Sequence, residues 1–475
     1  MDSTLTRPVS VSERADPASV FPRHAVMFAS FVLFYFLLRL PMLLSQWDGH
    51  DANGENAALL LGLAPGAEDM LTARIGGVLQ FSHGFSHPAP PYFFLLMLGK
   101  VVRAVVPLES LHGQALIFAV KAVASVIQLA AMLILLSVVV RYVRSRTAIA
   151  WIWVLAATPV ALYGSNEIQP DSGTGFFLMT LAFVGLLAAQ LQGKGPLRMA
   201  CLFAAGFFGG LGKNEWTLCL AAALAFTAVA HPFVRHGLKR FRGIALNPQD
   251  DDIAIVLALP ALGLLLGNSV SYWADAPNYM GGWYLLRDAV FRGSLASGDF
   301  ATWASFLKEK STYIFFHVIV LASGIVLLVC EPRRYSALVL LAFAAAAALF
   351  LSFLGSWVSF PRYFAPAYIG LGVSFLMIMV RAPPSGLARR IVAATMIAVS
   401  LQSAVFLTDW IVKGRGKVDV AAMLAKRDVG PPDCVLVIDS SFVLDRPDVD
   451  FVHNAFGVEF VDQFLARLGR PACPE

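Results

Sequence analysis

Apolar runs of about 20 residues recur along most of this 475-residue chain, and they constrain its fold more than any other feature. A run of this length is what a helix needs to cross the hydrocarbon core of a bilayer. Only 14% of the residues are charged, whereas a typical soluble domain carries about 25%. The sequence therefore predicts an all-α polytopic membrane protein.

Eleven of these runs are expected to be transmembrane helices. Residues 1–24 are polar and precede the first run, which favours an uncleaved first helix behind a short tail over a cleavable signal peptide. The expected helices cover residues 26–45, 114–140, 147–163, 174–191, 198–212, 216–233, 253–272, 313–330, 336–354, 364–380 and 391–410.

Basic residues orient these helices, because cytoplasmic loops carry an excess of lysine and arginine. One alternating set of loops is rich in them, as at Arg141, Arg144 and Arg146, whereas the opposite loop 164–173 has none. The N-terminus is therefore predicted to be cytoplasmic, and an odd number of crossings places the C-terminus outside. Because topology explains the net charge of +5, no nucleic-acid partner is expected.

Three regions follow from this organisation. Residues 1–25 form a cytoplasmic tail, residues 26–410 a membrane domain, and residues 411–475 an outer, periplasmic C-terminal region. Two outer loops, 46–113 and 273–312, are too long to be simple connections, and loops of this length are usually functional.

The long loops and the tail have recognisable composition. The first loop contains a short apolar stretch interrupted by Lys100 and Arg103, which predicts helices lying along the membrane interface. The second is rich in tryptophan and tyrosine, as is typical at the headgroup level. The tail is expected to be a small mixed α/β region, with a strand at 435–442 and a short helix at 457–469. Its two cysteines, Cys434 and Cys473, could form a disulfide outside the cell.

Three carboxylates follow the first apolar run in the stretch SQWDGHDANGEN: Asp48, Asp51 and Glu55. A hydrated loop in which Asn53 or Asp51 caps a short helix would explain them. A catalytic site at the membrane surface would explain them equally well. On this stretch alone both interpretations stay open.

Further polar residues occur where later runs begin or end, and the charge rule places them on the same outer side. Taken singly, each has a structural explanation, such as a turn, an interfacial anchor or an internal lysine–glutamate pair. For Lys213 and Glu215 in FFGGLGKNEW a functional role is favoured, because charges this deep are expensive unless paired or facing a wet cavity, and the neighbouring glycines imply close backbone approach. The outer-side set is His87, Glu167, Asp171, Lys213, Glu215, Arg362 and Tyr363.

Carboxylates and cations gathered at one membrane face suit a transfer reaction from a phosphate-bearing lipid. A carboxylate can accept the proton of an incoming hydroxyl, while arginine and lysine stabilise a departing phosphate. The sequence contains no Gly-rich nucleotide loop, no HExxH and no paired CxxC. No cofactor is predicted, although a divalent metal is compatible with the carboxylates.

The order of these motifs resembles the GT-C superfamily of polytopic glycosyltransferases, in particular the bacterial branch related to protein O-mannosyltransferases and to the lipid A aminoarabinose transferase. The resemblance implies transfer of a hexose or pentose from a polyprenyl-phosphate donor to an extracytoplasmic glycolipid, polysaccharide or protein. It also implies a location in the bacterial inner membrane, among membrane lipids. The likeness is carried, in family order, by DANGEN, HPAPPYFFLLMLGK, QPDSGTGFFLMTLAF, FFGGLGKNEW and RYFAP.

The resemblance also implies roles for single residues. An acid after the first helix is, or places, the catalytic base, and Asp171 supports the same site. The family has adjacent Asp-Glu where this chain has Asp51-Ala52 or Gly54-Glu55, so two registers remain; we expect Asp51 to be the base, with Glu55 and Asp48 beside it. The HPAPP stretch also has one residue more than the family's His-Pro-Pro. Binding of the substrate and its phosphate is implied for His87, Lys213, Glu215, Arg362 and Tyr363.

Two other functions compete with this one. A transporter or lipid flippase would need ionisable residues near the bilayer midplane. Arg39 and Lys121 lie inside apolar runs, but each is near an end and is expected to snorkel toward the headgroups. An inactive relative that acts as a scaffold is the third hypothesis, prompted by the interrupted Asp-Glu pair.

Overall fold

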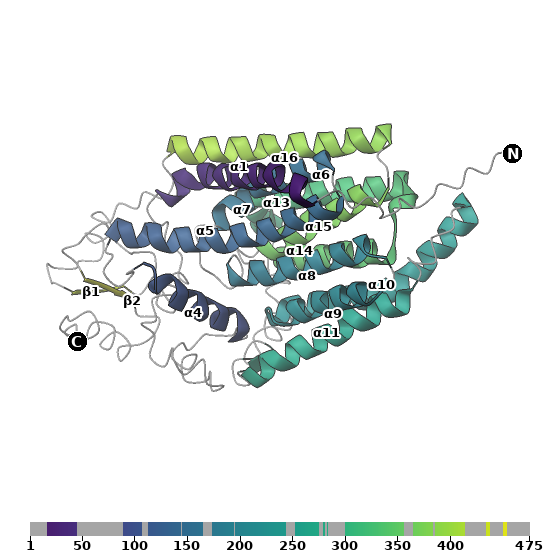
Figure 1. The fold of residues 1–475 in the computed structure, drawn as a ribbon, viewed down its shortest axis with the longest axis horizontal. Coiled ribbons are helices and arrows are strands. Elements are labelled where there is room, and N and C mark those ends of the chain that lie inside the picture. The colour runs from purple at the N-terminus through teal and green to yellow at the C-terminus, as the bar shows by residue number, and fades with distance from the viewer. Residues whose placement is uncertain are drawn as a thin grey trace.

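The structure is a computed structural model, and its described part is almost entirely helical (Figure 1). Eight of the described helices are long and apolar enough to cross a membrane. The fold is therefore that of a polytopic helical membrane protein, as the sequence predicts. The described residues are 17–44, 89–106, 113–143, 145–164, 173–193, 195–243, 252–274, 279–280, 283, 300–355, 364–382, 385–413, 434–437 and 450–453.

Each predicted apolar run coincides with one helix of the structure, except the run 147–163, which covers two. Three shorter apolar helices, α6, α9 and α15, coincide with the remaining three of the eleven runs, while the number of membrane crossings stays a prediction. The eight long helices are α1 (Pro17–Leu43), α5 (Gly113–Val138), α8 (Thr174–Leu191), α10 (Asn214–Arg242), α11 (Ile253–Ala274), α13 (Phe300–Cys330), α14 (Ala337–Gly355) and α16 (Gly386–Lys413). The other helical elements are α4 (Ala89–Arg103), the π-helix η3 (Val139–Val143), α6 (Arg146–Ala156), α7 (Pro159–Gly164), α9 (Pro196–Gly210), the 3₁₀-helix η4 (Pro332–Arg334) and α15 (Ala365–Arg381).

The predicted run 147–163 is divided into α6 and α7 by a local sequence signal. Pro159 has no backbone N–H and cannot continue α6, but it suits the first position of a new helix. The hydroxyl of Thr158 donates to the carbonyl of Leu155 at 3.0 Å and accepts from the N–H of Ala161 at 3.4 Å. Thr158 therefore ends one helix and caps the next.

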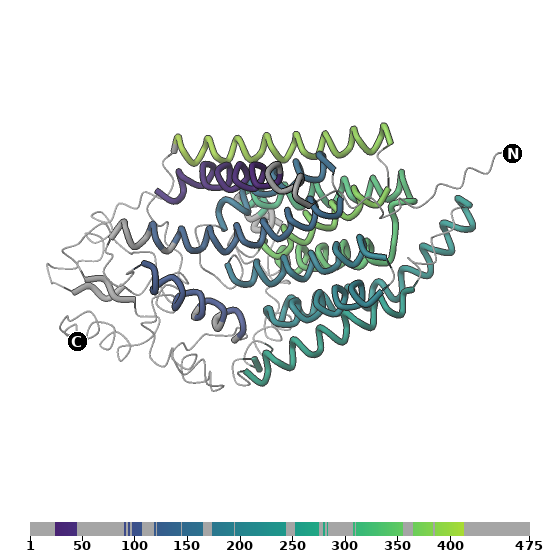
Figure 2. The backbone as a smooth tube through the Cα atoms, viewed as in Figure 1, coloured from purple at the N-terminus to yellow at the C-terminus, as the bar shows by residue number. Residues whose placement is uncertain are grey.

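Glycines let α9 and α11 pack with their backbones in contact, and the two helices lie side by side along one edge of the bundle (Figure 2). A Cβ atom built on Gly206 would be 1.9 Å from the carbonyl oxygen of Pro260, and one on Gly263 would be 2.1 Å from that of Phe203. Gly210 and Gly267 repeat the relationship one turn further on, at 2.5 and 2.3 Å from backbone oxygens. Both helices thus present the small-xxx-small spacing that favours close packing in membranes.

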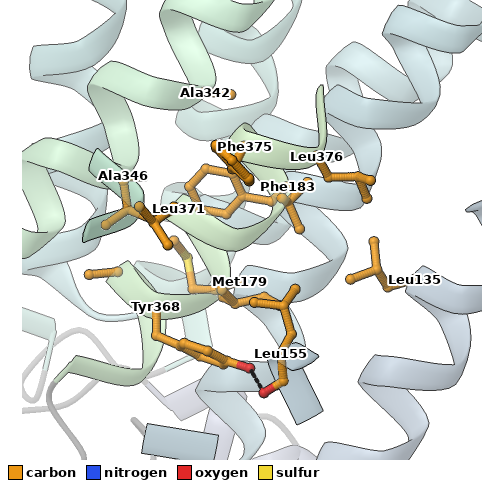
Figure 3. Packing of buried hydrophobic residues seen from close by; sticks show 14 of the residues in the cluster. Leu135, Leu155, Met179, Phe183, Ala342, Ala346, Tyr368, Leu371, Phe375 and Leu376 are labelled. Carbon is orange, nitrogen blue, oxygen red and sulfur yellow. Dashed lines mark hydrogen bonds between the residues drawn. The ribbon is translucent and has the colours of Figure 1, made fainter. Parts of the chain in front are cut away.

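The short helix α15 is at the centre of the apolar core. Every residue from 365 to 378 is buried, and the side chains around it come from α6, α8 and α14 (Figure 3). The indole N–H of Trp151 donates to the carbonyl of Gly372 at 2.9 Å, and the hydroxyl of Tyr368 donates to that of Leu155 at 2.5 Å. These two bonds join α15 to α6, so the start of α15 is held at a fixed depth in the bundle.

The interfacial helix and the strand expected from the sequence both have counterparts. Helix α4 has 15 residues, too few to cross a bilayer, and it lies obliquely near one end of the bundle, with β1 and β2 beyond that end (Figure 1). Strand β1 (Cys434–Val437) overlaps the predicted strand and pairs in parallel with β2 (Asp450–His453). The predicted helix at 457–469 and Cys473 lie outside the described residues.

Candidate functional site

The structure describes only part of the predicted site. Lys213 and Glu215 are described, and the other predicted residues lie outside the described part: Asp48, Asp51, Glu55, His87, Glu167, Asp171, Arg362 and Tyr363. The helix ends beside those residues are described. Leu43 ends α1 before the first acids, Ala89 begins α4 after His87, Thr174 begins α8 after Asp171, and Ala365 begins α15 after Tyr363.

Two buried cations join the end of α1 to its neighbours. The Lys121 ammonium, near the start of α5, donates to the carbonyl of Met42 at 3.0 Å. The Arg39 guanidinium donates to the carbonyl of Ala161 in α7 at 3.3 Å. The C-terminal ends of α1 and α7 therefore lie together with the N-terminal end of α5, as alternating helix directions require.

Arg39 and Lys121 correct an expectation from the sequence. Both were expected to snorkel toward the headgroups, but Arg39 is 0% exposed and Lys121 1% exposed. The reason is that carbonyls in the last turn of a helix lack intrahelical donors and carry partial negative charge. Sequence reasoning missed the buried hydrogen bonds of both residues, because the accepting carbonyls belong to helices far away in the chain. The one available signal was the presence of a cation near the end of an apolar run.

At the same end of the bundle, side-chain contacts connect α7 to α13 and α13 to the start of α15. The rings of Tyr163, at the end of α7, and Tyr313, in α13, meet edge to face with centroids 5.7 Å apart. One turn further along α13, the Nε2 atom of His317 lies 3.2 Å from the carbonyl oxygen of Phe364, the residue before α15. The start of α15, which follows Arg362 and Tyr363 in the chain, is thus connected to the ends of α1 and α7.

A contact path also leads from this group to α10. The His317 imidazole stacks on Phe350 of α14 with ring centroids 4.8 Å apart. Half a turn further along α14, Ser352 donates to the carbonyl of Leu349 at 3.0 Å and lies beside Cys219 of α10, which is six residues after Lys213. The helix ends that flank the acidic motifs and the helix end that carries Lys213 therefore lie at one end of the bundle.

Lys213 is the N-cap residue of α10, and only 3% of its surface is exposed. The polar side chains that follow it are buried as well: the Asn214 amide donates to the carbonyl of Tyr279 at 2.9 Å. Among the described residues, nothing hydrogen-bonds the amide oxygen of Asn214, the indole N–H of Trp216 or the hydroxyl of Thr217. A helix N-terminus with a lysine attracts anions, although Glu215 in the same first turn carries the opposite charge. This end of α10 therefore combines a lysine, a carboxylate and polar groups that no described residue uses.

The glycines before Lys213 are required by packing, as the sequence predicts. A Cβ atom on Gly212 would be 2.3 Å from the six-membered ring of Trp216, and one on Gly209 would be 2.3 Å from the side chain of Leu220. A side chain at Gly212 would displace the buried indole of Trp216, whereas the flexible end of Leu220 could move away from one at Gly209. The position of Lys213 therefore depends most on Gly212.

A small apolar cavity lies deeper along the same helix. It has a volume of about 20 Å³ and lies between α8, α9, α10, α11 and α14. Leu220 and Leu224 line it from α10, seven and eleven residues after Lys213, which is about 10 and 16 Å along the helix axis. Ala182, Gly206 and Ala345 are among the small residues that leave this space open. The side of α10 that faces the bundle is therefore apolar one to two turns beyond Lys213.

A metal centre is not apparent in the described part of the chain. No group of three or more His, Cys, Asp or Glu side chains among the described residues could hold a metal ion. The carboxylates that prompted the question, Asp48, Asp51, Glu55 and Asp171, lie outside those residues.

Comparison with known proteins returned one solved structure. No family model matches the sequence, and no curated protein matches it. The crystal structure of ArnT from Cupriavidus metallidurans in the apo state aligns with 85% of this chain at 16% sequence identity and a TM-score of 0.47. The chain spans 66% of the length of that structure. Both similarity values are low, so the likeness assigns no activity to this chain.

Proposed function

We propose that this chain is a membrane glycosyltransferase of the GT-C type, which moves a sugar from a polyprenyl-phosphate donor to an acceptor on the extracytoplasmic face. One observation carries the proposal. The ends of α1 and α7, which precede the acidic motifs, and the start of α15, which follows Arg362 and Tyr363, meet at the same end of the bundle as the buried Lys213. Such a transfer requires a base and a phosphate-binding cation on one face of the membrane.

Lys213 and the start of α10 are proposed to hold the donor phosphate. The ammonium and the helix N-terminus both favour the anionic phosphodiester of the donor, and they favour more strongly the additional negative charge that develops on the departing phosphate. The unpartnered groups of Asn214, Trp216 and Thr217 offer further hydrogen bonds there. Arg362 and Tyr363, which directly precede α15, are proposed to reach the same phosphate, with His87 and Glu215 completing the substrate site.

The apolar surroundings of Lys213 suit a lipid-linked donor better than a nucleotide sugar. Leu220 and Leu224 follow Lys213 along α10, so a hydrocarbon chain attached to a phosphate at Lys213 would run beside apolar side chains. The small cavity that these two residues line is apolar as well and offers no partner for a charged group. This arrangement supports a polyprenyl phosphate as the donor class.

The chemistry is a direct displacement. The carboxylate of Asp51, with Glu55 and Asp48 beside it and Asp171 supporting the site, takes the proton of the acceptor hydroxyl. The hydroxyl oxygen then forms a bond to the anomeric carbon as the bond from that carbon to the phosphate oxygen breaks. The electron pair of the broken bond leaves with the polyprenyl phosphate, whose charge Lys213 and Arg362 stabilise. One base suffices, because phosphate departs without a proton donor.

The test uses the purified full-length chain in lipid nanodiscs, a panel of polyprenyl-phosphate sugars and an acceptor-containing membrane extract. Release of free polyprenyl phosphate and labelling of the acceptor are expected. Lys213→Met should raise the KM for the donor by about tenfold or more, and Lys213→Arg should restore part of the affinity. An exposed lysine near the cytoplasmic end of α10, changed as Lys239→Met, is the matched control.

Two outcomes would overturn the proposal. The first is that wild-type protein releases no polyprenyl phosphate from any donor in the panel. The second is that the triple variant Asp51→Ala, Glu55→Ala, Asp171→Ala transfers as fast as wild type. Movement of an unchanged substrate across proteoliposome membranes would identify a transporter or flippase instead.

A further inference from the structure

Arg39 is a fully buried guanidinium whose contacts with the described residues are all with uncharged groups. It donates to the carbonyl of Tyr35, in its own helix, at 3.2 Å and to the carbonyl of Ala161, in α7, at 3.3 Å. Its Cζ atom lies 3.5 Å from the centroid of the Tyr35 ring. Within the described part of the chain, its Nε atom has no hydrogen-bond partner and no carboxylate forms an ion pair with it.

A buried cation of this kind is costly unless its surroundings compensate the charge. The compensation comes from α7. Ala161 is in the last four residues of that six-residue helix, where carbonyls have no intrahelical donor. The Arg39 side chain therefore satisfies the C-terminal end of α7 from α1, and the Tyr35 ring supports it from below. The contact is a link between two helices that are 122 residues apart in the chain.

Each of the two linked helices leads directly into an acidic segment. Helix α1 ends at Leu43, five residues before Asp48. Helix α7 ends at Gly164, three residues before Glu167 and seven before Asp171. The link between Arg39 and Ala161 therefore lies near the ends of the two helices that precede the acid-bearing segments in the chain.

We propose that Arg39 is a positioning residue, which sets the separation of the two acid-bearing segments by holding α1 to α7. The catalytic consequence rests on the proposed function, but the positioning itself does not. Because Arg39 is 0% exposed and two of its donors are used by carbonyls, it acts through the backbone of α7 and not by direct contact with the donor phosphate.

The variants separate positioning from charge and from general stability. Arg39→Met removes both the link and the charge. Arg39→Lys keeps the charge, but its single nitrogen replaces the two guanidinium nitrogens that donate to the carbonyls of Tyr35 and Ala161. Tyr35→Phe is the matched control: it keeps the ring beside Arg39 and removes a hydrogen bond of the same helix, from the Tyr35 hydroxyl to the carbonyl of Ser125 in α5 at 2.9 Å. That bond does not involve α7.

The first measurement needs no enzymatic activity. Spin labels are placed on Gln46→Cys and Asn166→Cys, one in each acid-bearing segment, in a full-length chain whose five native cysteines are replaced by alanine. Pulsed electron resonance in nanodiscs should give one distance distribution for wild type and for Tyr35→Phe. The distribution should be at least about twofold broader, or shifted, for Arg39→Met and Arg39→Lys; an unchanged distribution in folded variants overturns the proposal.

The second measurement is the kinetics of sugar transfer. Because a displacement of about 1 Å can cost about 100-fold in rate, Arg39→Lys should lower kcat by roughly that factor and leave the KM for the donor within about twofold. An increase in KM at unchanged kcat would instead mean that Arg39 binds the donor itself, and would overturn the proposal. If wild type transfers no sugar at all, the proposed function fails, and the spin-label distances still decide the role of Arg39.

Discussion

The imidazole of His317 in α13 lies between two backbone carbonyls, those of Tyr313 and Phe364. The Nδ1 atom is 2.9 Å from the carbonyl oxygen of Tyr313, and Nε2 is 3.2 Å from that of Phe364. A neutral imidazole carries one N–H, so only one of these contacts can be a hydrogen bond at a time. Since Phe364 follows Arg362 and Tyr363 in the chain, the choice of tautomer decides whether His317 holds the segment that carries them.

Replacing this histidine by an aromatic ring without nitrogen tests the link. His317→Phe retains the stacking on Phe350 but removes both polar contacts. We expect the free energy of unfolding to fall by about 1 to 2 kcal/mol, because one buried backbone carbonyl, that of Tyr313 or that of Phe364, loses its donor. We also expect a higher KM for the donor, because the Arg362 segment is no longer held. Thermal unfolding and donor titration measure the two effects.

The control for that variant is His236→Phe, at an exposed position of α10. His236→Phe should change neither the free energy of unfolding nor the KM for the donor. If His317→Phe resembles His236→Phe in both measurements, the contact with Phe364 has no part in holding α15.

The glycine packing of α9 against α11 predicts a large effect of one methyl group. Gly206→Ala would place its Cβ atom 1.9 Å from the carbonyl oxygen of Pro260, so the backbones must separate. We expect destabilisation of about 1 to 3 kcal/mol. Gly237→Ala, in an open position of α10 with no neighbour within 4 Å, should instead stabilise by about 0.5 to 1 kcal/mol. Thermal unfolding measures the stability change in both variants. Equal changes for Gly206→Ala and Gly237→Ala would contradict the close packing of α9 against α11.

The parts of this fold that follow from local signals could be predicted from the sequence. Apolar runs near the length of a membrane crossing led to the helices, and the glycines before Lys213 led to close backbone packing. The division between α6 and α7 also has a local cause, Thr158-Pro159, which the run 147–163 concealed because both halves are apolar.

The buried polar contacts could not be predicted, because each depends on chain segments far apart in the sequence. Arg39 and Ala161 are 122 residues apart, and Lys121 and Met42 are 79 apart. Nothing near Arg39 in the sequence indicates that the end of another helix needs a donor there. The assignment of Asp51, Glu55 and Asp171 stays a prediction, because these residues lie outside the described part of the chain.

At the opposite end of the bundle, Arg334 should matter for stability and not for transfer. Its guanidinium donates to the carbonyls of Ile378, Met379 and Ala382 at 3.0 to 3.1 Å, and it pairs with Glu331 at 2.6 Å. It therefore satisfies the C-terminal end of α15. Arg334→Met should lower the free energy of unfolding by about 2 to 3 kcal/mol, because the carbonyls lose their donor and Glu331 keeps only the hydroxyl of Ser385 as a partner.

The neighbouring exposed residue supplies the control for this prediction. Arg333→Met should leave the unfolding temperature unchanged, since a single exposed side chain contributes little. Transfer per folded molecule should stay at the wild-type level in both variants. A selective loss of kcat in folded Arg334→Met protein would contradict a purely structural role.

The two candidate bases can be separated by isosteric amides. Asp51→Asn removes the proposed proton acceptor with little change in shape, so kcat should fall by about 10² to 10⁴, the usual contribution of a general base. Glu55→Gln should lower kcat less, because a neighbouring carboxylate only supports the base, and Asp48→Asn should have the smallest effect. Initial rates at saturating donor measure the series. If Glu55→Gln gives the largest loss and Asp51→Asn retains activity, the register is reversed: Gly54-Glu55, and not Asp51-Ala52, then occupies the position of the family's Asp-Glu pair.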